Sequence, residues 1–210
     1  MQELSNIATP PELDENSVER NPIDLFRRWF DDALASRARL PNAMTLATAT
    51  ADGKPSARMV LLKQVDEEGF VFYTNYRSRK AAELESNPRA ALVFYWTYLD
   101  RQVRVEGTIT RVSAAESDEY FATRPRESQL GAQASPQSAV IASRKVLEES
   151  FRELEERYQE RPVERPEHWG GYRLAPDSIE FWQSREGRLH DRIAYERQAD
   201  GDWSIQRLAP

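Results

Sequence analysis

Residues 44–80 read MTLATATADGKPSARMVLLKQVDEEGFVFYTNYRSRK, and the pattern in this stretch decides the fold class. Apolar and polar residues alternate over Met44–Thr50 and again over Ser56–Val65, with Asp52-Gly53 between the two runs, which predicts a β-hairpin. A further turn leads into Phe70–Thr74, a short run of aromatic and β-branched residues that is typical of a strand. Consecutive strands joined by tight turns indicate an antiparallel sheet.

The segments on both sides of this stretch extend the prediction. Upstream, Asn21-Pro22 offers an N-cap and a proline at the first helical position, and apolar residues at helical spacing follow. Downstream, Ser78 is expected to cap a short helix that ends at Asn87-Pro88, which places Arg79 and Lys80 in its first turn. Further strands are predicted at Ala90–Leu99, Gln102–Val112, Tyr172–Leu174, Ile179–Gln183, Leu189–Arg197 and Trp203–Leu208, and further helices after the capping box Ser113–Glu116 and over Leu147–Tyr158.

About seven strands with helices inserted between them predict an α+β protein built on a small antiparallel β-barrel with flanking helices. A chain of 210 residues accommodates one domain with a sizeable core. We expect this domain to span residues 21–210. Residues 1–20 contain five acidic residues, one arginine, two adjacent prolines and few apolar groups, so they are predicted to form a mobile acidic arm.

The composition excludes several chemistries. The chain has no cysteine, which excludes disulfides, iron–sulfur clusters and cysteine nucleophiles. Its two histidines, His168 and His190, lie far apart without a metal-binding spacing, so no metal site is expected and a redox enzyme of this composition requires an organic cofactor. Neither GxGxxG nor GxxxxGK occurs, so a bound phosphate would be held by side chains and a helix start.

Charge and hydropathy patterning also bound the location and the partners. The N-terminal residues lack the pattern of a signal peptide, and no apolar run is long enough to span a bilayer, so we expect a cytoplasmic protein without a membrane partner. The net charge of -6 opposes long-range attraction to nucleic acid, and no nucleic-acid partner is expected.

Two clusters of cations lie in or beside the stretch that decides the fold. Ser78-Arg79-Lys80 opens a helix directly after a strand, so free backbone N–H groups, the helix dipole and two cations converge; the alternative is a solvated loop with surface cations. Arg58 and Lys63 end a hydrophobic run, and strand alternation would send them to opposite faces unless a bulge intervenes. Their alternative role is to cover a core strand with their aliphatic stems.

Two further clusters lie in the second half of the chain. Arg188, His190 and Arg192 would share one face of a strand, either as a ligand-binding face or as an exposed basic stripe, and the nearby Trp182 would wall a planar ring or fill the core. Tyr120, Arg124 and Ser128 follow a helix and its exit, with Tyr120 and Arg124 predicted on one helical face. This set suits a phosphate or a helix cap equally well.

Taken together, the segments from about Asn21 to Pro210 resemble the pyridoxine 5'-phosphate oxidase family. The resemblance rests on many motifs in the same order: RMVLLK from Arg58, FVFYTN from Phe70, SRKA from Ser78, RQVRVEG from Arg101, YFATRPRESQLGA from Tyr120, QS at Gln137, WGGYR from Trp169, EFWQ from Glu180, RLHDR from Arg188 and the terminal RLAP.

The resemblance implies an FMN-binding split β-barrel that is active as a homodimer with two sites at the subunit interface. It implies oxidation of pyridoxine 5'-phosphate and pyridoxamine 5'-phosphate to pyridoxal 5'-phosphate in vitamin B6 biosynthesis and salvage. Dioxygen would be the electron acceptor and would give hydrogen peroxide, and the amine substrate would also release ammonia. Other flavoproteins of the same fold and a non-catalytic carrier of pyridoxal 5'-phosphate are the alternatives.

The resemblance also implies residue roles. Positions that match the FMN site are Arg58, Met59, Val60, Leu61, Leu62, Lys63, Tyr73, Thr74, Arg79, Lys80, Gln102, Gln137, Ser138, Trp182 and Arg192. Positions that match the substrate-phosphate site are Lys63, Tyr120, Arg124 and Ser128. Arg188 and His190 match groups that lie against the pyridine ring, and they are the candidate catalytic residues, with His190 either a base or an orienting group.

The sequence departs from the family pattern at two places. Well-studied bacterial members carry Arg and Tyr in an N-terminal arm that covers the substrate, whereas the first tyrosine here is Tyr73 and the arm is acidic. The family usually has a glycine after the FWQ triplet, and this chain has Ser184, which fits unless the turn needs a positive φ.

Overall fold

A computed structural model describes residues 12–210 and shows the predicted hairpin as β1 (Ala43–Ala49) and β2 (Pro55–Leu61), paired antiparallel. The prediction of one strand over Ser56–Val65 is wrong, because β2 ends at Leu61 and β3 (Gln64–Asp66) begins after a break. At this break the backbone changes partners: the Leu62 N–H donates to Asn42 O, and the Lys63 N–H donates to Val71 O in β4 (Gly69–Asn75). Strand alternation therefore does not carry from Arg58 to Lys63.

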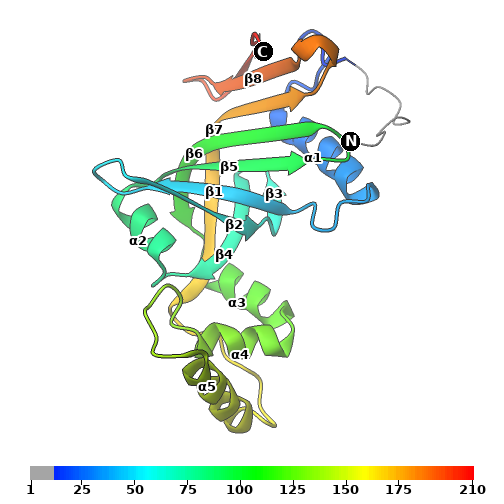
Figure 1. Cartoon of the computed structure of the whole chain (residues 1–210). Coiled ribbons are helices and arrows are strands. Elements are labelled where there is room, and N and C mark those ends of the chain that lie inside the picture. The colour runs from blue at the N-terminus through cyan, green and yellow to red at the C-terminus, as the bar shows by residue number, and fades with distance from the viewer. Residues whose placement is uncertain (1–11) are drawn as a thin grey trace. The chain divides into compact units, whose positions relative to one another are not determined.

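The remaining elements complete an α+β fold (Figure 1). They are α1 (Pro22–Ala35), α2 (Arg79–Ser86), β5 (Arg89–Trp96), β6 (Arg101–Arg111), α3 (Ala114–Thr123), α4 (Arg126–Ala134), α5 (Arg144–Arg157), β7 (Trp169–Gln183), a 3-10 turn at Glu186–Arg188, β8 (Asp191–Arg197) and β9 (Trp203–Arg207). The strands are hydrogen-bonded in the order β2-β1-β5-β6-β7-β4-β3, and β8 and β9 follow from β7. The predicted antiparallel α+β class is confirmed.

The chain divides into two compact units. Of the described residues, unit one holds residues 12–41, Val93–Val105 and Asp177–Pro210, and unit two holds Asn42–Leu92 and Glu106–Pro176. The division into an arm at residues 1–20 and one domain at residues 21–210 stays a prediction.

Unit one is built around aromatic residues of α1. Asn21 accepts a hydrogen bond from the Ile23 N–H and Pro22 occupies the first turn, as predicted. The helix buries one face, on which the Trp29 ring meets Phe181 edge to face at 5.2 Å between centroids. Edge-to-face aromatic pairs of this kind stabilise a core beyond the area that they bury. This face fixes α1 against β7.

Unit two carries the remaining helices. Figure 1 shows α2 beside β1, and α4 beside α5. Ser113 caps α3 as predicted, since its hydroxyl accepts from the Glu116 N–H. A separate apolar cluster lies under these helices and consists of Phe121, Leu130, Tyr158, Val163 and Trp169. This cluster gives α3, α4 and α5 a core of their own.

Three other predicted elements differ in the structure. The strands predicted at Tyr172–Leu174 and Ile179–Gln183 are one continuous strand, β7. The strand predicted from Leu189 begins only at Asp191, because Gly187 and Arg188 adopt φ values of 65° and 61° and turn the chain before it. Arg188 and His190 are therefore not on a shared strand face with Arg192.

Of the acidic arm, residues 12–20 are described, and Met1–Pro11 lie outside the described residues. Leu13 is buried, its N–H donates to the Asp191 carboxylate, and its carbonyl accepts from Arg207. Glu15 pairs with the same Arg207 at 2.7 Å, and Glu19 pairs with Arg28 at 2.6 Å. Residues 13–19 thus make specific contacts within unit one. No helix of the described residues is long and apolar enough to cross a membrane.

We expect Leu13→Ala to lower the free energy of unfolding by about 2 kcal/mol, because it removes a nearly buried leucine side chain and leaves a cavity. Urea unfolding followed by circular dichroism measures the change. Leu34→Ala is the matched control: Leu34 is 55% exposed, so its truncation should alter the stability by less than about 0.5 kcal/mol. Equal effects of the two substitutions would show that Leu13 contributes no packing.

Candidate active site

The turn between β4 and α2 gathers cations at the start of a helix. Asn75 shapes the turn, since its side chain accepts from the Arg77 N–H at 2.7 Å. Ser78 occupies the N-cap position, but its side chain makes no capping hydrogen bond; instead, its hydroxyl accepts from the Lys80 ammonium at 3.2 Å. The predicted position of the N-cap is therefore confirmed, but the expected hydrogen bond from the helix N–H groups to the Ser78 side chain is not formed. The Ser78 hydroxyl thus contributes to holding the Lys80 ammonium at the start of α2.

Lys80 joins three segments of unit two. Its Nζ donates to Thr74 Oγ1 in β4 at 3.1 Å and to Gln137 Oε1, after α4, at 2.8 Å. Burial, and next the nearby positive charge of Arg58, lower the pKa of Lys80 to about 8, although Glu83 acts in the opposite direction. Three residues predicted to hold the cofactor thus meet through direct hydrogen bonds.

A pocket of about 490 Å³ opens beside this group. Its lining brings together most of the residues of unit two that were predicted for the two sites: Met59, Val60, Leu61, Lys63, Tyr73, Thr74, Lys80, Tyr120, Arg124, Ser128 and Gln137. Arg79 and Ser138 line a neighbouring pocket of about 690 Å³, which Gln137 shares. Leu62 is instead buried, and Arg58 contacts Glu83. Side chains from five separate segments therefore converge in unit two.

Stacked rings form one wall of the 490 Å³ pocket. Tyr73 lies 4.0 Å from Tyr120 and 5.4 Å from Trp169 between ring centroids, and both pairs are nearly parallel. Gly171 allows this arrangement, because a Cβ there would come within 2.8 Å of the Tyr73 ring. Burial raises the pKa of Tyr73 to about 12, so its hydroxyl stays protonated at neutral pH. The wall consists of nearly parallel aromatic rings.

Arg124 enters the same pocket from the end of α3. The prediction that Arg124 shares a helical face with Tyr120 is wrong, because α3 ends at Thr123 and Arg124 is extended, as expected for a residue before Pro125. Its guanidinium lies 4.5 Å from the Trp169 ring, and burial lowers its pKa from the ordinary value. Among the described residues, Arg124 Nη1 is buried and has no hydrogen-bond partner. A buried donor without a partner favours an anionic ligand.

The other predicted site residues, Gln102, Trp182, Arg188, His190 and Arg192, belong to unit one. Trp182 and His190 lie 4.7 Å apart between ring centroids. Arg192 donates to Glu180 at 2.8 Å and to Ala209 O at 2.7 Å. The left-handed residues besides glycine are Asp100, Ser138 and Arg188 among those described, so the turn at Ser184 needs no positive φ.

His190 has a defined tautomer when it is neutral. Its Nδ1 accepts a hydrogen bond from the Arg185 N–H at 3.1 Å. A nitrogen that accepts cannot carry the proton, so neutral His190 is protonated at Nε2 and presents a donor there.

Two residues escaped the sequence prediction: Trp169, which lines the 490 Å³ pocket, and Glu83, which pairs with Arg58 and Arg79. Trp169 opens the WGGYR motif, but nothing in the sequence shows that its ring meets Arg124. Glu83 stands four residues after Arg79, a spacing that indicates an ion pair on the helix, but its contact with Arg58 arises only from the fold.

Comparison with known proteins agrees with this geometry. The family described as Pyridoxamine 5'-phosphate oxidase matches residues 30–158, and the Pyridoxine 5'-phosphate oxidase C-terminal dimerisation region matches residues 169–210. The chain is 60% identical over 198 residues to the pyridoxine/pyridoxamine 5'-phosphate oxidase of Rubrobacter xylanophilus, covering 94% of this chain and 91% of that protein. It is 59% identical over 200 residues to the Burkholderia lata protein of the same name, covering 94% and 93%.

Solved structures support the same fold. PhzG from Burkholderia lata, in complex with tetrahydrophenazine-1-carboxylic acid, has a TM-score of 0.90 and 32% identity, covering 97% of this chain and 100% of that one. A pyridoxamine 5'-phosphate oxidase-related, FMN binding protein from Nostoc punctiforme has a TM-score of 0.72 at 20% identity, covering 88% and 97%, and supports the split-barrel fold. The two family matches and the curated relatives show that this chain belongs to the pyridoxine/pyridoxamine 5'-phosphate oxidase family of oxidoreductases.

Proposed function

We propose that the protein is an FMN-dependent oxidase that converts pyridoxine 5'-phosphate and pyridoxamine 5'-phosphate to pyridoxal 5'-phosphate, in vitamin B6 biosynthesis and salvage. Dioxygen is the acceptor and gives hydrogen peroxide, and the amine substrate also releases ammonia. The observation that carries this proposal is the buried, unpartnered Nη1 of Arg124, in a pocket that also presents Lys63 and Ser128. Two cations and a hydroxyl suit a phosphate monoester.

The residues of the α2 turn fit the phosphate of FMN. Arg58, Arg79 and Lys80 supply positive charge, and the start of a helix adds its dipole. When bound, FMN supplies the hydride acceptor and returns the electrons to dioxygen. Thr74 and Gln137, together with Ser138, add polar groups around the same place. Gln102, Trp182 and Arg192 complete the proposed FMN set.

Arg188 and His190 are the proposed catalytic pair. With its proton on Nε2, neutral His190 donates a hydrogen bond and has no lone pair there to act as a base. We therefore assign it to orienting a substituent of the substrate ring, with Arg188 beside it in sequence. Catalysis then rests on orientation and on phosphate anchoring by Lys63, Tyr120, Arg124 and Ser128.

PhzG defines the alternative. It shares 32% identity with this chain, and its complex contains tetrahydrophenazine-1-carboxylic acid, so a related protein of this fold binds a different compound. The alternative is oxidation of a ring carboxylic acid without a phosphate. The unpartnered Arg124 pairs with a carboxylate as well as with a phosphate, so the substrate's phosphate is the point to test.

We further propose a homodimer in the cytoplasm. The match of residues 169–210 to a C-terminal dimerisation region supports self-association, and closed two-fold dimers are the commonest assembly. A chain without cysteine needs no oxidising compartment to fold.

The experiment that tests the activity is the visible spectrum of FMN-loaded protein during anaerobic addition of pyridoxine 5'-phosphate. We expect bleaching of the flavin band, and its return with hydrogen peroxide when air is admitted. A protein that cannot be loaded with FMN, or a flavin that pyridoxine 5'-phosphate leaves oxidised, would overturn the proposal.

We expect Arg124→Ala to lower kcat/KM for pyridoxine 5'-phosphate by about tenfold to a hundredfold, mostly through KM, because it removes a charge-assisted contact to the phosphate. FMN affinity should persist, and activity with unphosphorylated pyridoxine should be nearly unchanged. Arg152→Ala, an exposed arginine of α5, is the control. An equal fall in kcat/KM with both substrates would show that Arg124 does not contact the phosphate of the substrate.

We also expect the affinity for FMN to depend on pH. The protonated amine of Lys80 attracts a phosphate dianion, and its pKa of about 8 in the flavin-free protein means that this form is lost as the pH rises. The dissociation constant should be nearly flat between about pH 7 and 8, where the phosphate stays a dianion, and should rise toward about tenfold per pH unit above pH 8. Lys80→Arg should flatten the rise, because a guanidinium stays charged. A pH-independent wild-type constant between pH 7 and 9.5 would contradict this assignment.

A further inference from the structure

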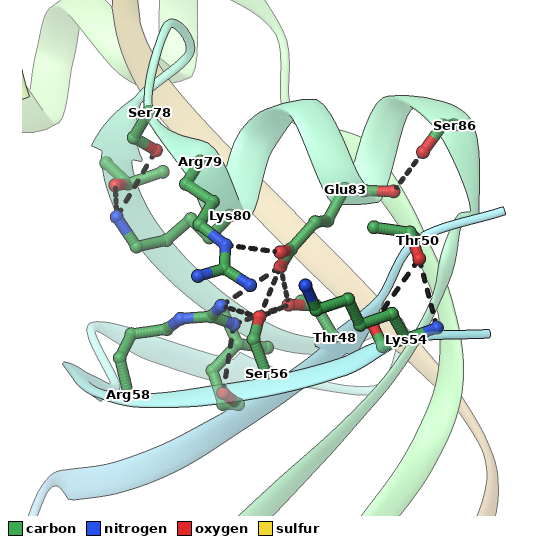
Figure 2. Close-up of polar contacts among 12 residues, drawn as sticks. Thr48, Thr50, Lys54, Ser56, Arg58, Ser78, Arg79, Lys80, Glu83 and Ser86 are labelled. Atoms are coloured by element: carbon green, nitrogen blue, oxygen red, sulfur yellow. Dashed lines mark hydrogen bonds and ion pairs between the residues drawn. The ribbon is translucent and has the colours of Figure 1, made fainter. Parts of the chain in front are cut away.

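Glu83 of α2 is a nearly buried acid among the cations of the proposed FMN site, and none of the roles assigned above includes it. Its side chain is 4% exposed. Figure 2 shows its carboxylate surrounded by donors from three elements: Oε2 accepts from Thr48 of β1 and Ser56 of β2, and from Arg58 Nη2 at 3.0 Å. Oε1 accepts from Arg79 Nε at 2.8 Å.

The carboxylate is ionised in spite of its burial. Burial by itself raises the pKa of Glu83, but the hydrogen bonds from Ser56, Thr48, Arg79 and Arg58 outweigh it and hold the pKa at about 2. One negative charge therefore bridges two guanidinium groups that would otherwise repel each other. The two hydroxyls act on the same pair, since Arg58 also donates to Thr48 and to Ser56.

The bridge leaves Arg79 able to meet an anion through its terminal nitrogens, whereas Arg58 keeps only its Nε–H and its positive charge for an anion. Arg79 contacts Glu83 through Nε, and its side chain is 60% exposed, so Nη1 and Nη2 remain available among the described contacts. Arg58 is held on both sides: Nη1 donates to Leu46 O at 3.2 Å and to Thr48, and Nη2 donates to Ser56 and to Glu83. Lys80 adds a third cation, so the cluster keeps a positive balance even with the carboxylate counted.

We propose that Glu83 is a positioning residue for the cofactor phosphate. It holds Arg58 and Arg79 together before any anion arrives, so that a phosphate meets two guanidinium groups already in place. This inference rests on the proposed FMN site and assigns it an organising residue. Two effects oppose each other: the carboxylate repels a phosphate, but its loss would let two long side chains separate and lose order. Because its charge is already neutralised by the arginines, the ordering effect is the larger.

The test is the affinity of flavin-free protein for FMN and for riboflavin, which lacks the phosphate, measured by quenching of flavin fluorescence. Glu83→Gln keeps the shape, removes the charge and turns an amide donor toward the arginines. We expect it to weaken FMN binding by about tenfold or more and riboflavin binding by less than about threefold. A merely structural role would lower both affinities alike.

Glu85→Gln is the matched control, two residues along the same helix. Glu85 is 49% exposed and pairs with Arg111 at 2.7 Å and with the Tyr172 hydroxyl at 2.9 Å. Both affinities should be unchanged in this variant. If Glu83→Gln does not fold, Ser56→Ala replaces it: this variant removes one donor of the cluster, keeps the charge, and should weaken FMN selectively by a few-fold.

The outcomes separate the two proposals. Wild-type protein that binds neither flavin would overturn the FMN site and this inference with it. Wild-type protein that prefers FMN, together with a Glu83→Gln variant of the same or tighter FMN affinity, would overturn the positioning role alone. Selective loss of FMN affinity in Glu83→Gln, with Glu85→Gln unchanged, would support it.

Discussion

Positive charge concentrated at the start of α2 is the constraint on which the architecture of unit two depends. Arg58 and Arg79 share one carboxylate, and Lys80 is buried enough for its pKa to fall to about 8. Such a cluster is unfavourable unless neighbouring groups stabilise it. Strands β1 and β2 supply hydroxyls, α2 supplies Glu83, and the segment after α4 supplies Gln137. Several elements of this unit are thus tied together by the hydrogen bonds and ion pairs of this cluster.

The neighbouring 490 Å³ pocket is shaped by aromatic stacking. Its wall is the parallel stack of Tyr73, Tyr120 and Trp169, which needs Gly171 for the close approach of the Tyr73 ring. A flat apolar wall suits an aromatic ring, and a buried guanidinium at its edge suits an anion. The pocket therefore offers separate places for an aromatic ring and for an anionic group attached to it. A phosphorylated vitamer, with its pyridine ring and its phosphate, would require these two places.

Relations within one element were predicted well from the sequence where the local signal was strong. The hairpin, the caps at Asn21 and Ser113 and the antiparallel α+β class agree with the structure. The sequence predicted less well the features that depend on which strands pair with each other. The alternation of apolar and polar residues predicts one strand from Arg58 to Val65. In the structure the backbone changes its hydrogen-bonding partner strand between Leu62 and Lys63, which ends the first strand. Likewise, Leu189 reads as a strand residue, but left-handed turns at Gly187 and Arg188 precede β8.

By itself, the sequence determined which side chains are present and their local spacing: no cysteine, two histidines far apart, cations after a strand, and motifs that resemble those of one family in the same order. These properties depend on which side chains are present and on local spacing. Only the tertiary structure decided which groups meet. It brought Glu83 to Arg58 and Trp169 to Arg124, and left one nitrogen of Arg124 buried without a partner. Burial and contacts between residues distant in sequence arise from packing of the whole chain, so no local pattern encodes them.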